Sequence, residues 1–322
     1  MQNISYKPSE CPLCASKNIK DVDNTLRNVS DYKPILCNKC SLIFLDKLYF
    51  TNQEKLDKFY QGEYLKEYYK DGKNDILFNF NNKTPYQAIR KERISDYLKN
   101  DSNVLDIGCG PGYFLESIRE NVAKVIGVEK NYEERSFVND HLKIPCYEDY
   151  TMIKEKFDII VLNQVLEHVY NPPFFLRKLT SILSETGVFV IEVPSATNPL
   201  VALYNNRSFT NFWFQEPHLW YFNQKTLKLT LEKAFGENCV DRIDFFQETS
   251  FINHYNWVFH NKKSPSREQA TSNSFPLTGI KNSSITSDLE QLFIDFNIGY
   301  KNILNNAGYG DTMLAIVRPS SN

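Results

Sequence analysis

The chain has 322 residues and a formal net charge of −2. This length accommodates one catalytic domain with smaller additions, and the near-neutral charge excludes the broad basic field of a nucleic-acid-binding protein. No apolar run reaches the roughly 20 residues of a membrane helix, and the first eight residues lack the apolar core of a signal peptide. We therefore expect a cytoplasmic protein without a membrane span.

Four of the seven cysteines form two Cys-x-x-Cys pairs, Cys11/Cys14 and Cys37/Cys40. Each pair can place two thiolates on one side of a tight turn, and four thiolates suit tetrahedral Zn²⁺. Because no coordination position is left for a water molecule, we expect a structural metal. The sequence predicts a zinc ribbon over residues 1–48, completed by a strand after the second pair.

Residues 49–100 are predicted to form a helical linker or lid. Tyr60, Tyr64 and Tyr68 recur every four residues and would share one helix face. That face could pack against the protein or cover a ligand. Pro85 opens a second predicted helix over residues 85–99.

Residues 104–112 contain three glycines directly after a short apolar strand. An amphipathic stretch follows, with Phe114, Leu115 and Ile118 on one face. A strand, a glycine turn and a helix in this order let the backbone approach a nucleotide-like ligand. Asp106 at the strand end would repel phosphate, so it suits a ligand with hydroxyls and a cationic amino acid part.

A second predicted strand, residues 124–129, ends in Glu129, 23 positions after Asp106. In a βαβ unit this spacing places an acid at the tip of the neighbouring strand, where it can accept ribose hydroxyls. A weaker strand over 144–150 carries Glu148 and Asp149. Strands and helices alternate as far as residue 193, which predicts a parallel sheet covered on both faces. One of these helices is expected to begin at Pro172-Pro173 and to end at Gly187.

The pattern Asp-x-Gly-x-Gly-x-Gly after Val104-Leu105 resembles motif I of class I S-adenosylmethionine-dependent methyltransferases. The apolar strand 157–162, followed by Asn163-Gln-Val-Leu-Glu-His168, resembles the post-strand segment of a large subgroup of them. The resemblance implies an α/β, Rossmann-like, seven-stranded sheet over residues 101–322 with an antiparallel last strand. It also implies S-adenosylmethionine as cofactor, bound by Asp106, Gly108, Gly110, Gly112, Glu129, Asn163, Glu148 and Asp149.

Residues 196–222 interrupt the alternation with aromatic and amide side chains, and we interpret them as an acceptor pocket, a lid or a surface hairpin. The stretch Glu216–Leu227 resembles a segment of sugar methyltransferases whose histidine can be the general base. That resemblance makes His218 the first catalytic candidate and His168 the second. Sugar C-methyltransferases carry His-Glu-His there, whereas this chain has Glu216-Pro217-His218.

Residues 250–310 are predicted to form a substrate-side region. Asn253-His254-x-x-Trp257 resembles a segment of zinc-ribbon methyltransferases of the polysaccharide-modifying type, although a packing role is equally open. A polar loop over 261–285, a helix over 287–304 and a last strand over 310–318 follow. The candidate substrate residues of the whole chain are Glu167, Tyr204, Glu216, Asn253, His254 and Asp311.

The predicted reaction is methyl transfer to a small-molecule hydroxyl, that of a nucleotide-linked sugar in surface-polysaccharide or secondary-metabolite synthesis. Sugar C-methylation is one alternative, although enzymes of that type have an extra C-terminal domain for which this chain is too short. A ribosomal-RNA base methyltransferase and a non-enzymatic zinc-ribbon protein are the others. Neutral charge argues against a nucleic-acid partner, and the oligomeric state stays open.

Overall fold

The computed structural model describes residues 9–27, 31–49, 51–63, 76–83, 87–274 and 284–319. The predicted positions Tyr64, Tyr68 and Pro85 lie outside these residues. The chain divides into two compact units. The first contains Met1–Tyr49, Val193–Leu227 and Ile243–Leu314, and the second contains Phe50–Glu192, Lys228–Arg242 and Ala315–Asn322.

Seven strands form the larger sheet, in the spatial order β10-β11-β8-β7-β4-β5-β6. Neighbouring strands from β8 to β6 run parallel, and the last strand of the chain is antiparallel. The predicted α/β methyltransferase sheet is therefore confirmed. Its strands are β4 (Asn103–Ile107), β5 (Lys124–Val128), β6 (Cys146–Tyr147), β7 (Phe157–Asn163), β8 (Leu183–Pro194), β10 (Val240–Phe246) and β11 (Thr312–Val317).

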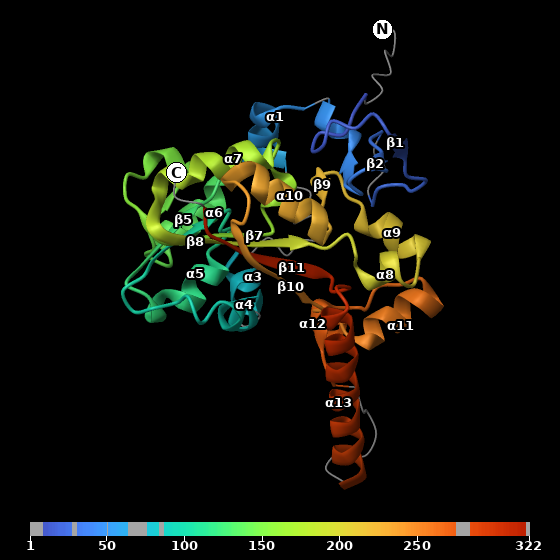
Figure 1. The fold of residues 1–322 in the computed structure, drawn as a ribbon. Coiled ribbons are helices and arrows are strands. Elements are labelled where there is room, and N and C mark those ends of the chain that lie inside the picture. The colour runs from blue at the N-terminus through green and yellow to red at the C-terminus, as the bar shows by residue number, and fades with distance from the viewer. Residues whose placement is uncertain are drawn as a thin grey trace. The chain divides into compact units, whose positions relative to one another are not determined.

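Helices cover both faces of this sheet, with α4 and α5 on one face and α7 and α10 on the other (Figure 1). The central strands β4 and β7 are continuous apolar runs because both of their faces are covered. The helices nearest the sheet are α3 (Ile76–Lys83), α4 (Gln87–Arg93), α5 (Tyr113–Ile118), α6 (Tyr132–Asp140), α7 (Pro172–Leu179) and α10 (Gln224–Phe235).

The strand register brings three predicted cofactor residues to one edge of the sheet. Asp106 of β4 pairs with Gly127 of β5, two residues before Glu129, and with Val161 of β7, two residues before Asn163. The carboxyl ends of these parallel strands therefore meet. In an open α/β sheet this edge is where ligands bind.

Two predicted helix ends were wrong. Helix α7 ends at Leu179, and Gly187, the expected stop, lies inside β8. A Cβ atom on Gly187 would approach the carbonyl oxygen of Phe157 to 3.0 Å and the Leu183 side chain more closely still. The glycine therefore serves a close strand contact. Helix α4 ends at Arg93 rather than at residue 99.

The first unit contains a four-stranded antiparallel sheet, in the order β1-β2-β3-β9. Leu26, Leu45, Phe214 and Tyr221 form its core cluster. Its last strand comes from the aromatic segment 196–222, which also forms two short helices. These elements are β1 (Ile19–Asp21), β2 (Pro34–Cys37), β3 (Ile43–Leu45), α8 (Pro199–Ala202), α9 (Arg207–Trp213) and β9 (Trp220–Tyr221).

The remaining helices of the first unit follow β10 in the chain. The predicted helix 287–304 is present as the longer α13 (Ser284–Asn306), preceded by α11 (Phe251–His260) and α12 (Arg267–Thr271). The other helical segments are η1 (Asp46–Tyr49), α1 (Gln53–Lys58), η2 (Phe59–Glu63), η4 (Arg119–Asn121), η5 (Tyr150–Met152), η6 (Leu166–His168) and η7 (Thr180–Ile182). Among the described residues, no helix is both long and apolar enough to cross a membrane.

Candidate functional site

The glycine turn after β4 adopts backbone conformations that other residues rarely reach. Gly108, Gly110 and Gly112 all have positive φ, at 70°, 55° and 84°. A Cβ atom on Gly112 would lie 2.7 Å from a Leu142 methyl carbon, so this glycine permits packing of the turn. A Cβ atom on Gly110 would meet no atom closer than 3.9 Å. Gly110 therefore leaves open space where a ligand can approach the backbone.

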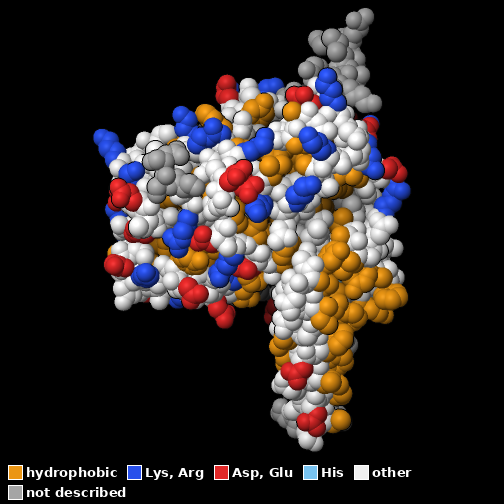
Figure 2. All heavy atoms as spheres, in the orientation of Figure 1, with side chains coloured by type: hydrophobic (Ala, Val, Ile, Leu, Met, Phe, Trp, Pro, Cys, Tyr) orange, Lys and Arg blue, Asp and Glu red, His pale blue; other side chains and the backbone are white. Residues whose placement is uncertain are grey.

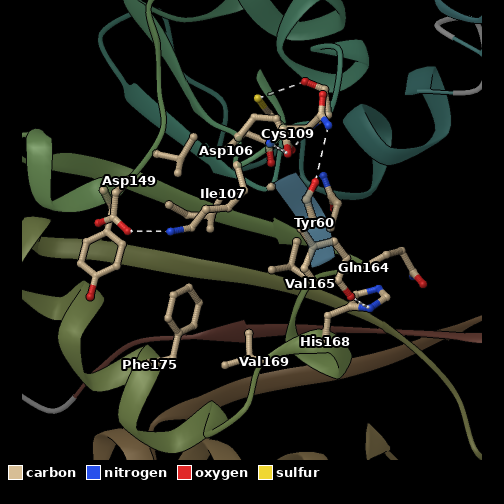
Figure 3. Close-up of a pocket in the computed structure, with 18 of the residues that line it drawn as sticks. Tyr60, Asp106, Ile107, Cys109, Asp149, Gln164, Val165, His168, Val169 and Phe175 are labelled. Carbon is tan, nitrogen blue, oxygen red and sulfur yellow. Dashed lines mark hydrogen bonds and ion pairs between the residues drawn. The ribbon is translucent and has the colours of Figure 1, made fainter. Parts of the chain in front are cut away.

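A cavity of about 790 Å³ lies beside this turn, and all its lining residues fall between Gln53 and Lys178. Its volume lies within the range of small-molecule sites, about 300–1,000 Å³. Figure 3 shows Asp106, Tyr60, Asp149 and His168 around it. Residues from 196–222 and 250–310 are not among the described residues that line this cavity.

Asp106 is a buried carboxylate that faces the cavity without full pairing. Its exposed fraction is 2%, and its Oδ1 atom has no hydrogen-bond partner. Burial raises the pKa of Asp106 to about 8; the positive charge of Arg90 opposes this shift and the Glu129 carboxylate adds to it. A ligand cation placed here would supply the missing partner and favour the ionised carboxylate.

Glu129 follows β5 and is held by the backbone of the glycine turn. Its two carboxylate oxygens accept hydrogen bonds from the N–H groups of Gly110, at 2.9 Å, and Asn131, at 2.8 Å. Burial nevertheless raises the pKa of Glu129. Because each oxygen keeps a second lone pair, the carboxylate can also accept two hydroxyl groups of a ligand.

The two acids after β6 are placed differently. Asp149 lines the cavity and accepts hydrogen bonds from the Lys130 ammonium, at 3.1 Å, and from the Thr151 N–H, at 2.9 Å. Glu148 is not among the lining residues, and its oxygens accept from Gln61 and Arg135. Only Asp149 of this predicted pair therefore borders the cavity.

The loop after β7 carries two further buried polar groups without partners. Asn163 lines the cavity, and its Nδ2 atom has no hydrogen-bond partner. Glu167 is fully buried, and neither carboxylate oxygen has one. Burial raises the pKa of Glu167 to about 8, with a smaller contribution from the Glu192 carboxylate. Buried polar groups without partners destabilise the folded state. They therefore mark sites where a bound ligand can supply the missing hydrogen bonds.

His168 reaches the cavity from the short helix η6. Its Nδ1 atom lies 2.8 Å from the Tyr60 hydroxyl, and the two rings meet edge to face. Its Nε2 atom lies 3.8 Å from a Glu167 oxygen. The imidazole is therefore contacted by Tyr60 at Nδ1 and has the Glu167 carboxyl near Nε2.

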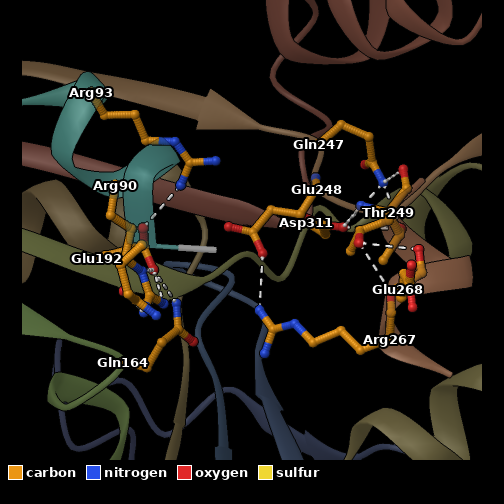
Figure 4. Close-up of polar contacts among 12 residues, drawn as sticks. Arg90, Arg93, Gln164, Glu192, Gln247, Glu248, Thr249, Arg267, Glu268 and Asp311 are labelled. Atoms are coloured by element: carbon orange, nitrogen blue, oxygen red, sulfur yellow. Dashed lines mark hydrogen bonds and ion pairs between the residues drawn. The ribbon is translucent and has the colours of Figure 1, made fainter. Parts of the chain in front are cut away.

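An ion-pair cluster supports this loop from the end of β8. The fully buried Glu192 accepts from Arg90, at 2.6 Å, and from Arg93, at 3.0 Å (Figure 4). It also accepts from the Gln164 side chain, at 3.1 Å, while the Gln164 N–H bonds to the Glu192 carbonyl oxygen. These contacts hold Gln164 at φ 58°, a left-handed conformation that costs energy in a non-glycine residue.

Comparison with known proteins matches this part of the chain to one family. Residues 81–237, just under half of the chain, match a family model described as a methyltransferase domain. Residues 81–237 form a methyltransferase domain. Together with the strand order and the glycine turn, this match makes it a class I S-adenosylmethionine-dependent domain.

The chain is similar to the ubiquinone biosynthesis O-methyltransferase of Pelagibacter ubique strain HTCC1062, with 29% identity over 164 residues. That match covers 45% of this chain and 66% of the relative. The enzyme of the same name from Glaesserella parasuis serovar 5 strain SH0165 is 35% identical over 109 residues, covering 29% of this chain and 46% of the relative. The chain thus matches less than two thirds of the length of these relatives.

Among solved structures, the chain is similar in part to a SAM-dependent methyltransferase from Archaeoglobus fulgidus. It is 22% identical, with a TM-score of 0.48, and the match covers 76% of this chain and 99% of that one.

Outside the methyltransferase domain, the four paired cysteines form one cluster. Their sulfur atoms all lie within 4.8 Å of one another, with Cys11–Cys40 at 3.7 Å and Cys14–Cys37 at 3.6 Å. A tetrahedral zinc site with Zn–S bonds of about 2.3 Å has sulfur–sulfur edges of about 3.8 Å. The cluster therefore has the dimensions of a four-thiolate metal site.

The two turns that carry these cysteines share one backbone pattern. Ala15 and Ser41 each follow the second cysteine of a pair, and both have positive φ, at 54° and 67°. The N–H of each donates to the carbonyl oxygen of the first cysteine in its pair, at 2.9 and 2.8 Å. Two equivalent turns thus direct four sulfur atoms to one point, which fits the predicted zinc ribbon.

Three predicted substrate residues join one hydrogen-bond network in the first unit. Tyr204 contacts the Tyr300 hydroxyl at 2.8 Å, and Tyr300 contacts Nδ1 of His254 at 2.5 Å. On its other side His254 meets Thr249, whose hydroxyl donates to Asp311 at 3.0 Å. Burial lowers the pKa of His254 to about 4. The histidine is therefore neutral at neutral pH.

The other predicted residues of the first unit are engaged locally. Asn253 is buried near the start of α11 and accepts from the Ser264 N–H at 3.4 Å. Glu216 accepts from the buried Lys47 ammonium at 2.8 Å. His218 precedes β9, with Nε2 at 2.7 Å from the Gln215 amide nitrogen. The cavity lining described above includes none of the three.

Tyr60, Gln87 and Arg90 line the cavity, and the sequence did not single them out as cofactor or catalytic residues. Tyr60 belonged to the predicted tyrosine row, which was one signal for it. Arg90 and Gln87 lie on helix α4. Which face of this helix borders the cavity depends on how the helix packs on the sheet, and the sequence does not give that packing. Lys130 and Asn131 also line the cavity. Both directly follow Glu129 in the sequence, so their place at the end of the same strand could have identified them as lining residues.

Proposed function

We propose that the protein transfers the methyl group of S-adenosylmethionine to a hydroxyl oxygen of a small molecule, and that this molecule is a sugar. In this reaction the acceptor oxygen forms a bond to the methyl carbon and the carbon–sulfur bond breaks. The sulfonium would become a neutral thioether, and the hydroxyl proton would pass to a base. The observation that carries the proposal is the cavity itself, which combines an open glycine turn with buried, unpartnered polar groups in a methyltransferase domain.

The cofactor fits the polar groups that the cavity offers. When bound, S-adenosylmethionine supplies an electrophilic methyl group on a positively charged sulfur. Glu129 would accept its ribose hydroxyls, and Asp106 would pair with its ammonium group. The Arg90–Arg93–Glu192 cluster has a net positive charge beside the cavity, which favours the cofactor carboxylate. Asp149, Tyr150 and Phe175 border the side suited to the adenine ring.

His168 is our proposed general base within this cavity. A neutral imidazole with its proton on Nδ1 can donate to the Tyr60 oxygen and accept the acceptor's proton on Nε2. His218, the first candidate from sequence, remains the rival. The turnover rates of His168→Ala and His218→Ala decide between them. The control is cofactor affinity, which should be unchanged in both variants. A large loss of turnover in His218→Ala alone would overturn the assignment to His168.

The sugar acceptor rests on the sequence segments around His218 and His254, and the relatives support O-methylation as the reaction type. A labelled-methyl assay tests both, with nucleotide sugars, catechols and RNA as acceptors. We expect label in a nucleotide sugar, as a methyl ether whose linkage mass spectrometry identifies. Label in a sugar carbon, or in RNA alone, would overturn the proposed O-methylation of a small molecule.

A phenolic hydroxyl is the second candidate acceptor, because the relatives are named ubiquinone biosynthesis O-methyltransferases. Label in the catechol arm with none in the sugar arm would support it.

We propose that the cysteine cluster holds one structural Zn²⁺. Four thiolates leave no open coordination position, and so small a sheet has little core of its own, so metal binding would supply folding energy. We expect about one zinc per chain by elemental analysis. Cys11→Ser should lose the metal and the order of the small sheet. Full folding of the metal-free protein would contradict this role.

A further inference from the structure

Helix α13 carries a long row of apolar side chains that face solvent. The helix has 23 residues, so it is about 35 Å long. Asn297 and Leu304 are buried, so their side of the helix packs against the rest of its unit. Along another side run exposed side chains, visible in Figure 2 as a hydrophobic strip that continues over α11. They are Ile285 (61% exposed), Leu289 (37%), Leu292 (61%), Phe296 (50%) and Ile303 (70%).

The spacing of this row is that of a coiled coil. Starting at Ile285, the intervals are four, three, four, three and four residues, with Gly299 completing the series between Phe296 and Ile303. This seven-residue repeat keeps apolar side chains on one narrow seam, which suits pairing with another helix. A Cβ atom built on Gly299 meets nothing within 4 Å, so a partner helix can approach closely there.

The charges of α13 argue for a second copy of the same helix in parallel orientation. The charged side chains among residues 284–296 are Asp288, Glu290 and Asp295, and all three are acidic. This disfavours an anionic membrane surface as the partner. In an antiparallel self-pair, Asp288 and Asp295 would face the same acids of the other copy. In a parallel pair they face the positions of Phe293 and Tyr300, which carry no charge.

We propose that α13 forms a parallel two-stranded coiled coil with α13 of a second copy, giving a homodimer with two-fold symmetry. Each seam residue then meets its own counterpart, Leu292 against Leu292 and Ile303 against Ile303. Three heptads are at the short end of stable coiled coils, and we expect an interface near the lower bound of about 1,200 Å². The dimer should therefore dissociate reversibly on dilution.

Sedimentation and light scattering over a range of concentrations test the dimer. The full chain has a mass of 37.6 kDa, and we expect twice that mass at high concentration and monomer on dilution. Leu292→Glu places a charge in the seam and should weaken dimerisation at least about tenfold. The matched control is Ile298→Glu, because Ile298 is apolar and 42% exposed but lies off the seam. A monomer at every concentration, or a dimer unaffected by Leu292→Glu, would overturn the proposal.

Cross-linking tests the orientation independently of affinity. In a parallel pair, Leu292→Cys brings the two new thiols into one layer, so diamide should link them into a dimer seen on a non-reducing gel. Ile298→Cys should not form this product. Circular dichroism confirms that each variant is folded. Absence of the Leu292→Cys product in a sample that is dimeric by light scattering would exclude the parallel arrangement.

Discussion

Two regions of the molecule withdraw polar atoms from water and differ in how far hydrogen bonds pair them. Beside the glycine turn, Asp106, Asn163 and Glu167 are withdrawn from water and hold polar atoms without hydrogen-bond partners. In the first unit, His254 is buried and Asp311 is partly exposed, and hydrogen bonds reach each of them from several sides.

The difference separates a binding role from a structural one. A buried, unpaired carboxylate destabilises the folded state, so it persists where another molecule completes its hydrogen bonds. A carboxylate such as Asp311, which accepts from two backbone N–H groups and from two side chains, stabilises the loops that donate to it. We infer that the first region is organised for the cofactor and the second for rigidity.

The largest expected effect is on cofactor affinity. Asp106→Ala and Glu129→Ala should each weaken S-adenosylmethionine binding by at least about a hundredfold, because each removes charge-assisted hydrogen bonds. Asp106→Ala should not lower the free energy of unfolding, since it also removes an unpaired buried group. Titration calorimetry and thermal unfolding of the same samples measure both quantities. Unchanged affinity in both variants would refute the assignment of the cofactor site.

Asp311→Asn should show the opposite pattern. The new amide nitrogen would face donors that now bond to the carboxylate, so we expect a loss of about 2–3 kcal/mol in the free energy of unfolding. Cofactor affinity should stay unchanged. Chemical denaturation with a cofactor titration measures the two effects. A stable variant that binds cofactor but has lost turnover would return Asp311 to the substrate role predicted from sequence.

Much of the fold was predictable because local pattern determines it. The glycine turn, the apolar strands β4 and β7 and the two cysteine pairs are each encoded within a few residues. Gly187 was assigned wrongly because a glycine can end a helix or allow a close strand contact, and only the neighbouring strand decides. Strand β9 was not predicted because its partner, β3, lies about 175 positions earlier in the chain.

The candidate site divides in the same way. Asp106 and Glu129 follow from strand order and spacing, so they could be proposed as cofactor residues from the sequence. Arg90 and Tyr60 could not be assigned, because their approach to the cavity depends on how separate helices pack against the sheet. The unpaired state of Glu167 is also a tertiary property, which no local pattern reports.

Glu167 should leave a signature in the pH dependence of stability. Its pKa in the folded state is about 8, above the ordinary 4.5, so the folded protein keeps a proton that the unfolded chain releases. The associated stability is fully present below about pH 4.5 and is lost as the pH rises to about 8.

Glu167→Gln should therefore flatten the decline in unfolding free energy between pH 5 and pH 8, by about 1–3 kcal/mol over that range. Asp106, Glu129 and Asp311, whose pKa values are also raised, contribute to the decline that remains. Denaturant unfolding of the cofactor-free protein at several pH values is the measurement. Glu185→Gln, at an exposed position, is the control. Identical slopes in wild type and Glu167→Gln would mean that the Glu167 carboxyl is paired in solution.

The smallest expected effect concerns Tyr60 as a positioning residue for His168. If Nδ1–H of His168 donates to the Tyr60 oxygen, that oxygen stabilises the imidazolium formed during the reaction. Tyr60→Phe should then make His168 a weaker base, lowering the maximal rate by about tenfold or less. The acid limb of the pH–rate profile should move to lower pH, with little change in cofactor affinity. Tyr150→Phe, another tyrosine of the cavity lining, is the matched control and should leave the profile in place. A fall in rate without a shift of the acid limb would assign Tyr60 to packing alone and would remove the main structural support for His168 as the base.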